Sequence, residues 1–164
     1  VMGSRGSVIP FFAGIASGKK IPITHPDMTR FMISLEDAVE LVWHSFDDMV
    51  GGEIYVKKIP SMKVVELAKT IAPNADHEIV GIRPGEKMHE QMIGFEDAAF
   101  TYEYPKHYKI LPSIHSWGLD PERISDGKRV APDFTYTSDN NREWMSSGEL
   151  ELWLEDNKSN IGKI

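Results

Sequence analysis

One short stretch, residues 81–90, constrains the fold of this chain more than any other. An apolar run over residues 77–82 stops at an Arg-Pro-Gly sequence, and a charged segment that begins at Glu86 follows it. Proline cannot continue a strand ladder and glycine permits a tight turn, so the pattern predicts a strand, a turn and then a helix. Such junctions bind anionic ligands in α/β folds, because helix N-termini attract negative charge. Arg83 is therefore either a phosphate ligand or an ordinary surface arginine beside a turn.

The segment before this stretch predicts a helix over residues 35–49. Ser34 opens a capping-box sequence, and apolar residues recur at helical spacing after it. The pattern places the aromatic side chains of this stripe, Trp43 and Phe46, in the core.

A second strand and helix complete an alternating series from residue 34 to 92. Residues 53–56 read as a strand, and Ser61 is expected to cap a helix that Pro73 stops. Its buried side would comprise Val64, Val65, Leu67, Ala68 and Ile71. With the strand at 77–82, the series predicts an α/β fold with at least two neighbouring parallel strands and right-handed crossovers.

The first residues predict a bend and a helix. Two glycines and two serines surround one arginine in residues 1–8, which favours a tight turn with exposed amides. The apolar run over residues 8–16 then reads as a helix with Pro10 in its first turn, Ser7 as its cap and Gly18 at its end.

Two strands are expected next. Residues 21–24 read as a short edge strand, and residues 28–33 as a strand in which Arg30 is the one charged side chain. A lone arginine in such a strand needs a partner. An internal Asp or Glu would be a structural partner, and an anionic ligand would be a functional one.

The pattern changes after Gly94. Residues 95–145 mix aromatic residues with turn formers and contain one short strand at 107–111. We therefore expect an α/β substrate-binding portion over residues 1–94 and a less regular extension over residues 95–164. A capping box at Ser146 starts a last helix, which buries Leu150, Trp153 and Leu154.

Composition excludes several function classes. The 18 basic and 25 acidic residues give a net charge of −7, which repels a polyanion such as DNA. The absence of cysteine excludes disulfides and thiolate ligands and suits a reducing compartment. The six histidines show no metal-binding spacing, no apolar run is long enough for a bilayer, and no nucleophile or phosphate-loop motif is present.

Local arginines must then hold any anionic ligand. Arg5, Arg30 and Arg83 all lie at predicted strand ends or turns, so their convergence would create a diphosphate site. Glu86 is spaced to accept hydrogen bonds from a ribose diol, although a carboxylate in a first helical turn also simply complements the helix dipole. From its residues alone, the chain is a binding module for an anionic ligand.

Six motifs in order resemble the C-terminal half of the inverting UDP-N-acetylglucosamine 4,6-dehydratases, which are extended short-chain dehydrogenases/reductases of bacterial polysaccharide biosynthesis. They lie at residues 3–10, 22–24, 28–31, 51–62, 82–90 and 130–141, and the resemblance runs from residue 1 to about 155. It implies the C-terminal part of a Rossmann-like NAD(P)-binding fold, with a substrate-binding subdomain of small mixed sheets and helices. The chain opens in mid-phrase and is expected to be a piece of a longer polypeptide.

The resemblance implies roles only for the substrate half. Arg30 and Arg83 match diphosphate and nucleotide contacts, and Glu86 matches the ribose contact. Val8 and Pro10 match the start of the helix that covers the nucleotide. The turn with Ser4 and Arg5 matches the wall between nicotinamide and substrate, and residues 140–141 match a tail that packs on the body or on a neighbouring subunit. The catalytic residues and the cofactor fingerprint belong to the missing half.

The expected function is the UDP-sugar-binding half of a cytoplasmic dehydratase, inactive without the N-terminal Rossmann half that holds NADP. The full-length protein is expected to form a homo-oligomer, and no nucleic acid, membrane or metal partner is expected. A related nucleotide-sugar epimerase, or a binding or assembly protein that kept the fold without the chemistry, is the alternative.

Overall fold

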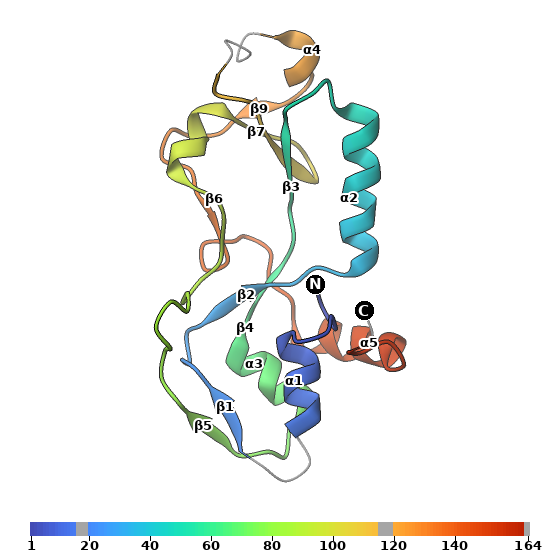
Figure 1. Ribbon diagram of the computed structural model, residues 1–164, viewed down its shortest axis with the longest axis vertical. Coiled ribbons are helices and arrows are strands. Elements are labelled where there is room, and N and C mark those ends of the chain that lie inside the picture. The colour runs from blue at the N-terminus through green and yellow to red at the C-terminus, as the bar shows by residue number, and fades with distance from the viewer. Residues whose placement is uncertain (16–19, 115–119, 163–164) are drawn as a thin grey trace. The chain divides into compact units, whose positions relative to one another are not determined.

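The computed structural model describes residues 1–15, 20–114 and 120–162, and these residues form two compact units (Figure 1). Unit 1 comprises Val1–Ser34, Pro60–Glu90 and Ser138–Ile164, and unit 2 comprises Leu35–Ile59 and Gln91–Thr137. The expected end of the helix at residue 18 lies outside the described residues. The predicted division of the chain at residue 94 stays a prediction.

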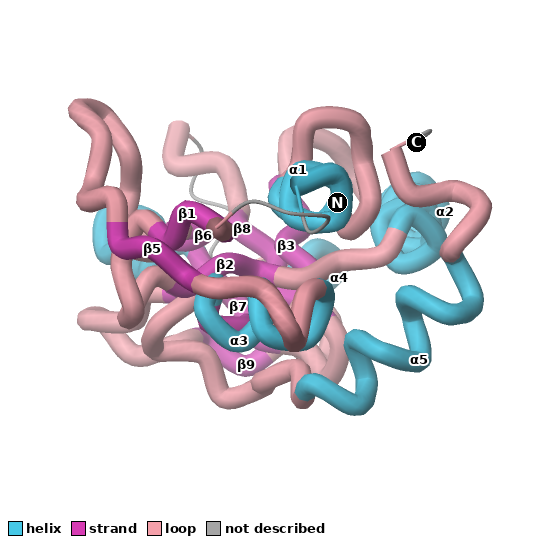
Figure 2. The backbone as a smooth tube through the Cα atoms, turned by 90° about the horizontal axis from the view of Figure 1, so that it is seen from below, coloured by secondary structure: helices cyan, strands magenta, loops and turns pink. Residues whose placement is uncertain are grey.

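The described residues of unit 1 form small sheets and three helices. Its elements are α1 (Val8–Ile15), β1 (Ile21–Ile23), β2 (Thr29–Phe31), β4 (Ser61–Lys63), α3 (Val64–Ile71), β5 (His77–Ile79) and α5 (Ser147–Asn157). Strands β1 and β5 lie side by side and pair in parallel (Figures 1 and 2). Strand β2 pairs with β4 in antiparallel register. The helices bury one core, in which Leu67, Ala68 and Leu150 are fully buried. The two predicted helices with these residues are confirmed, as is the capping box of Ser146 and Glu149.

Unit 2 is built around an antiparallel sheet in the order β3-β8-β7-β9. Its elements are α2 (Leu35–Asp48), β3 (Ile54–Lys57), β6 (Gln91–Ile93), the 3-10 helix η1 (Phe95–Phe100), β7 (Thr101–Glu103), β8 (His107–Ile110), α4 (Pro121–Ile124), β9 (Lys128–Arg129) and β10 (Tyr136–Thr137). Strand β10 pairs with β6. The Tyr136 hydroxyl accepts from the backbone N–H of Ile59 and donates to its carbonyl, both at 3.0 Å, and so ties β10 to the end of the β3 segment.

The α/β class with small mixed sheets is confirmed, but three predicted elements are wrong. No helix begins at Glu86: a turn at residues 84–85, where Gly85 has a φ of +81°, and a bend at residues 88–89 lead into β6 instead. Ser61 does not cap α3, since it is buried in strand β4. The strand at 53–56 is not a parallel neighbour of the strand at 77–82, because β3 pairs with β8 in antiparallel fashion while β5 pairs with β1.

Two predicted side-chain roles are also wrong. The aromatic residues of α2 are not core residues, because Trp43 is 66% exposed and Phe46 is 64% exposed. Ser7 precedes α1 and its carbonyl accepts from Phe11 N–H, but its hydroxyl is buried without a hydrogen-bond partner among the described residues and so forms no side-chain cap. Within the described ranges, no helix has the length and apolar character needed to cross a bilayer.

Candidate functional site

Unit 1 contains a cavity of about 470 Å³ between the N-terminal turn, α1 and the strands β1 and β2. Arg30, Arg83, Glu86 and Val8 border it, so four of the residues singled out from the sequence meet at one place. Pro10, Ser4 and Arg5 are not among the described residues that border it. The roles of all seven residues stay predictions.

The turn after β5 shapes the polar end of the cavity. Arg83 N–H donates to Glu86 Oε2 at 3.2 Å, and Glu86 N–H donates to Arg83 O at 3.0 Å. The Thr24 hydroxyl, which follows β1, donates to Glu86 Oε1 at 3.4 Å. Both carboxylate oxygens are thus hydrogen-bonded, and this closes the loop that the sequence had predicted as a helical turn.

Arg30 is held by its own strand and by the segment before β6. Its Nη1 donates to Thr29 O at 2.7 Å and to Met88 O at 3.2 Å, and its Nε lies 3.6 Å from Glu90 Oε1. Glu90 is the internal carboxylate that sequence reasoning offered as a structural partner. Because Arg30 also borders the cavity, with 22% of its side chain exposed, the guanidinium is oriented by these contacts and still reaches the site.

A buried hydroxyl network behind β2 fixes this geometry, and the sequence gave no sign of it. Thr29 Oγ1 lies 2.7 Å from His89 Nδ1 and 2.6 Å from Ser138 Oγ. Ser138 Oγ also accepts from Glu90 N–H at 2.9 Å. Thr29 is 2% exposed and Ser138 is fully buried, so the network positions residues 88–90 rather than contacting a ligand.

The N-terminal turn forms another wall. Gly3 and Gly6 adopt φ values of +72° and +77°, which confirms the predicted tight bend. Gly6 and Ser7 border the cavity, whereas the Ser4 hydroxyl donates to Val1 O at 2.8 Å and Arg5 is exposed.

The remaining wall is apolar. Phe11, Phe12, Pro22 and Val80 border the cavity, and Phe11 is half exposed. Phe11 and Phe12 belong to the apolar run of the first helix, in which only Val8 and Pro10 were singled out from the sequence. Two arginines, a fixed carboxylate and aromatic side chains around one cavity can hold an anion, a diol and a flat apolar ring.

Residues 140–141, the predicted tail, belong to unit 1, where Asn141 contacts β4. Asn141 Nδ2 donates to Ser61 Oγ at 3.0 Å, and Trp144 Nε1 donates to Asn141 O at 2.9 Å. Over the described part of the chain, no group of three or more His, Asp or Glu side chains is placed to bind a metal ion.

Comparisons with known proteins agree with this architecture. The chain is 49% identical over 157 residues to an inverting UDP-N-acetylglucosamine 4,6-dehydratase of Campylobacter jejuni, a match that covers 92% of the chain and 47% of the relative. It is 37% identical over 159 residues to a UDP-glucose 4-epimerase of Rickettsia rickettsii, covering 94% of the chain and 47% of that protein. The crystal structure of Pen from Bacillus thuringiensis matches with a TM-score of 0.79 and 30% identity, over 96% of this chain and 48% of that one.

The chain therefore spans about half the length of the curated relatives it matches. The family model described as "Polysaccharide biosynthesis protein" matches residues 1–112, which include every residue named above as bordering the cavity. This chain belongs to that family of polysaccharide biosynthesis proteins.

Proposed function

We propose that this chain is the UDP-sugar-binding half of a nucleotide-sugar 4,6-dehydratase that converts UDP-N-acetylglucosamine to a 4-keto-6-deoxy sugar with inversion at C5. The observation that carries the proposal is the convergence of Arg30, Arg83 and Glu86 on one cavity, in a chain 49% identical to half of such an enzyme. The arginines would hold the diphosphate, Glu86 the ribose diol and the apolar wall the uracil ring. Val8 and Pro10 would begin the helix that covers the nucleotide.

The hydride chemistry would come from NADP held by the other half of the family's polypeptide. We expect no cofactor to bind this chain alone: the Ser4 hydroxyl is engaged with Val1 O, and neither Ser4 nor Arg5 is among the described residues that border the cavity. The role proposed for this turn is limited to a wall between nicotinamide and substrate. We place the protein in the cytoplasm and expect it to be inactive alone and oligomeric when complete.

Calorimetric titration of UDP and UDP-N-acetylglucosamine tests the site. Arg83→Ala is expected to weaken binding about 10-fold or more, because a charge-assisted hydrogen bond contributes about 1.5–3 kcal/mol. Arg142→Ala, which removes an exposed arginine of unit 1 that does not border the cavity, is the charge-matched control and should leave affinity unchanged. Thermal melting of both variants checks that they fold.

Two results would overturn the proposal. One is the absence of nucleotide binding, both by the chain alone and by the chain joined to the other half of a family member. The other is an equal loss of affinity in the two arginine variants, since that would mean unspecific attraction of the anion.

The second candidate is an epimerase, which the 37% identity to a UDP-glucose 4-epimerase supports. Product analysis of the enzyme made by joining the two halves separates the two reactions. Dehydration gives a 4-keto-6-deoxy sugar, whereas epimerisation gives an isomer of the substrate with an unchanged molecular formula. If the chain joined to the other half of a family member binds the nucleotide sugar but catalyses neither dehydration nor epimerisation, the result would favour a non-catalytic binding protein.

A further inference from the structure

Three segments that lie far apart in the sequence meet beside Arg30. Met88 O accepts both the Thr29 backbone N–H and Arg30 Nη1, each at 3.2 Å. Ser138 N–H donates to Glu90 O at 2.8 Å, and Ser138 Oγ accepts from Glu90 N–H at 2.9 Å. Residues 88–90 are therefore bonded both to β2 and to Ser138.

The same three segments also share a group of buried side-chain contacts. Thr29 Oγ1 lies 2.6 Å from Ser138 Oγ and 2.7 Å from His89 Nδ1. Thr29 is 2% exposed and Ser138 is fully buried, so water does not compete for these hydrogen bonds. Residues 84–90 belong to no helix or strand, so their path depends on such single contacts and not on a ladder of hydrogen bonds.

Arg30 takes its orientation from residues 88–90. Its Nη1 donates to Met88 O, and its Nε lies 3.6 Å from Glu90 Oε1. The Glu90 side chain is 43% exposed, so water weakens this ion pair and Arg30 keeps its charge available to an anion in the cavity that it borders. A guanidinium donates paired hydrogen bonds to a phosphate only from a fixed geometry. A shift of residues 88–90 would therefore release the guanidinium from its place at the cavity.

We propose that Ser138 is a positioning residue of the nucleotide site, because it holds residues 88–90 against β2 and thereby aims Arg30 into the cavity. Ser138 is not among the described residues that border the cavity, and it lies outside residues 1–112, which the family model matches. The motif at residues 130–141 thus contributes to ligand binding without contacting the ligand. The inference rests on the proposed function, since the anion that Arg30 holds is the diphosphate of a UDP-sugar.

Calorimetric titration of the 164-residue chain with UDP is the first test. Ser138→Ala is expected to weaken binding about 3- to 10-fold, because Arg30 loses its fixed geometry but keeps its charge. Ser61→Ala is the matched control and should leave the affinity unchanged. It removes another fully buried hydroxyl of unit 1, which accepts from Asn141 and does not border the cavity in the described part of the chain. An equal loss of affinity in the two serine variants would overturn the proposal, because it would mean a general loosening of unit 1.

A double-mutant cycle shows whether the effect passes through Arg30. Arg30→Ala is expected to weaken UDP binding about 10-fold or more. In the Arg30→Ala background, Ser138→Ala should then change the affinity by less than about 2-fold, because the side chain that Ser138 positions is gone. Losses that multiply in the double variant would overturn the proposal, since Ser138 would then act independently of Arg30.

The neighbouring hydroxyl provides a second pair of variants if Ser138→Ala does not fold. Thr29→Val keeps the shape of the side chain and removes the hydroxyl that contacts Ser138, whereas Thr29→Ser keeps that hydroxyl. Thr29→Val is expected to weaken UDP binding about 3- to 10-fold, and Thr29→Ser should restore most of the affinity. Equal affinities of these two variants would overturn the proposal, because the hydroxyl contact would then have no effect on the site.

The order of the Arg30 side chain can be measured without a ligand. In NMR relaxation, the Nε–H group of Arg30 should be ordered in the unaltered chain and in Ser61→Ala. In Ser138→Ala it should be mobile, with an order parameter below about 0.6. Equal order parameters in the two serine variants would overturn the inference.

These measurements separate the inference from the proposed function. Absence of UDP binding, together with an Arg30 side chain that Ser138→Ala makes mobile, overturns the proposed function alone. If UDP binds and Arg83→Ala weakens its binding while Ser138→Ala does not, the positioning role of Ser138 alone is overturned.

Discussion

The Thr24 hydroxyl donates a hydrogen bond to Glu86 Oε1 at 3.4 Å across 62 positions of sequence. It joins the end of β1 to the turn after β5, the two strands of the parallel pair. Because Arg83 N–H binds the other carboxylate oxygen, Glu86 enters the cavity with a fixed orientation. Thr24 is therefore a positioning residue for the carboxylate.

Thr24→Val should weaken UDP binding about 2- to 10-fold, since a neutral hydrogen bond contributes about 0.5–1.5 kcal/mol. The Thr70 hydroxyl bonds within α3, to Glu66 O, and Thr70 does not border the cavity in the described part of the chain, so Thr70→Val is the matched control. Calorimetry should find its affinity unchanged. Equal affinities of Thr24→Val and the unaltered chain would remove Thr24 from the site.

A buried imidazole in unit 2 should make stability depend on pH. His107 is 8% exposed, stacks on Tyr104 with ring centroids 4.6 Å apart, and has no hydrogen-bond partner at Nε2 within the described residues. Burial, reinforced by the neighbouring His44, lowers the pKa of His107 from 6.5 to about 4. The unfolded chain then binds a proton that the folded chain excludes, so stability falls as the pH drops from about 6.5 toward 4.

His107→Phe should remove this dependence. When the pH falls from 7 to 5, the unaltered chain should lose about 2 kcal/mol more of its unfolding free energy than His107→Phe loses. Urea unfolding at the two pH values measures it. If the unfolding free energies of the two proteins change equally between pH 7 and pH 5, His107 is not the group responsible for the pH dependence.

Much of unit 1 could be predicted from local patterns. The capping box at Ser146 and the apolar spacing of α3 each specify a helix without help from the rest of the chain. The turn at Gly85 could not be predicted from a local pattern, because its conformation depends on Glu86 accepting hydrogen bonds from the Thr24 hydroxyl and from Arg83 N–H. The hydroxyl network of Thr29, His89 and Ser138 likewise joins residues up to 109 positions apart, which no local pattern reveals.

The error at α2 has a different cause. Periodicity identified the apolar side of the helix correctly, and the assumption that this side faces the core of the same chain was wrong for Trp43 and Phe46. A pattern reports which side of a helix avoids water, but it does not say which polypeptide provides the cover.

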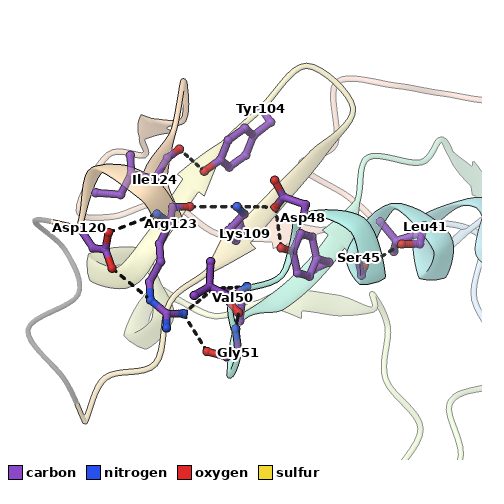
Figure 3. Close-up of polar contacts among 12 residues, drawn as sticks. Leu41, Ser45, Asp48, Val50, Gly51, Tyr104, Lys109, Asp120, Arg123 and Ile124 are labelled. Atoms are coloured by element: carbon purple, nitrogen blue, oxygen red, sulfur yellow. Dashed lines mark hydrogen bonds and ion pairs between the residues drawn. The ribbon is translucent and has the colours of Figure 1, made fainter.

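The ion pair between the buried Lys109 and the partly exposed Asp48 (Figure 3) should be costly to break, because the buried charge is the one that would lose its partner. Lys109 is 1% exposed, pairs with Asp48 and donates to Arg123 O at 2.9 Å. Burial alone would raise the pKa of Asp48, but hydrogen bonds from Lys109 and Tyr55 outweigh it, and the pKa lies below its ordinary value. Asp48→Asn leaves the buried ammonium without a counter-charge.

Denaturant unfolding of Asp48→Asn should show a loss of about 3–5 kcal/mol, the usual cost of removing one partner of a buried pair. The double change Asp48→Leu with Lys109→Met should recover most of it. Asp27→Asn breaks the exposed contact with Lys63 and should cost less than about 1 kcal/mol. Similar losses in the two single variants would mean that burial of Lys109 adds nothing.

The N-terminal turn that borders the site should depend on Trp153 of α5. Gly3 has a φ of +72°, and a Cβ added there would lie 2.8 Å from a ring carbon of Trp153. Gly6 has a similar φ of +77°, but a Cβ there would meet nothing within 4 Å. Gly6→Ala should therefore lower the unfolding free energy by about 1–2 kcal/mol, because alanine is strained in the left-handed conformation. Gly3→Ala should lower it by about 1–3 kcal/mol more, because its Cβ also overpacks against Trp153. Thermal unfolding measures both, and combining Gly3→Ala with Trp153→Leu should cancel the excess. Equal losses in the two alanine variants would show that the turn does not rest on α5.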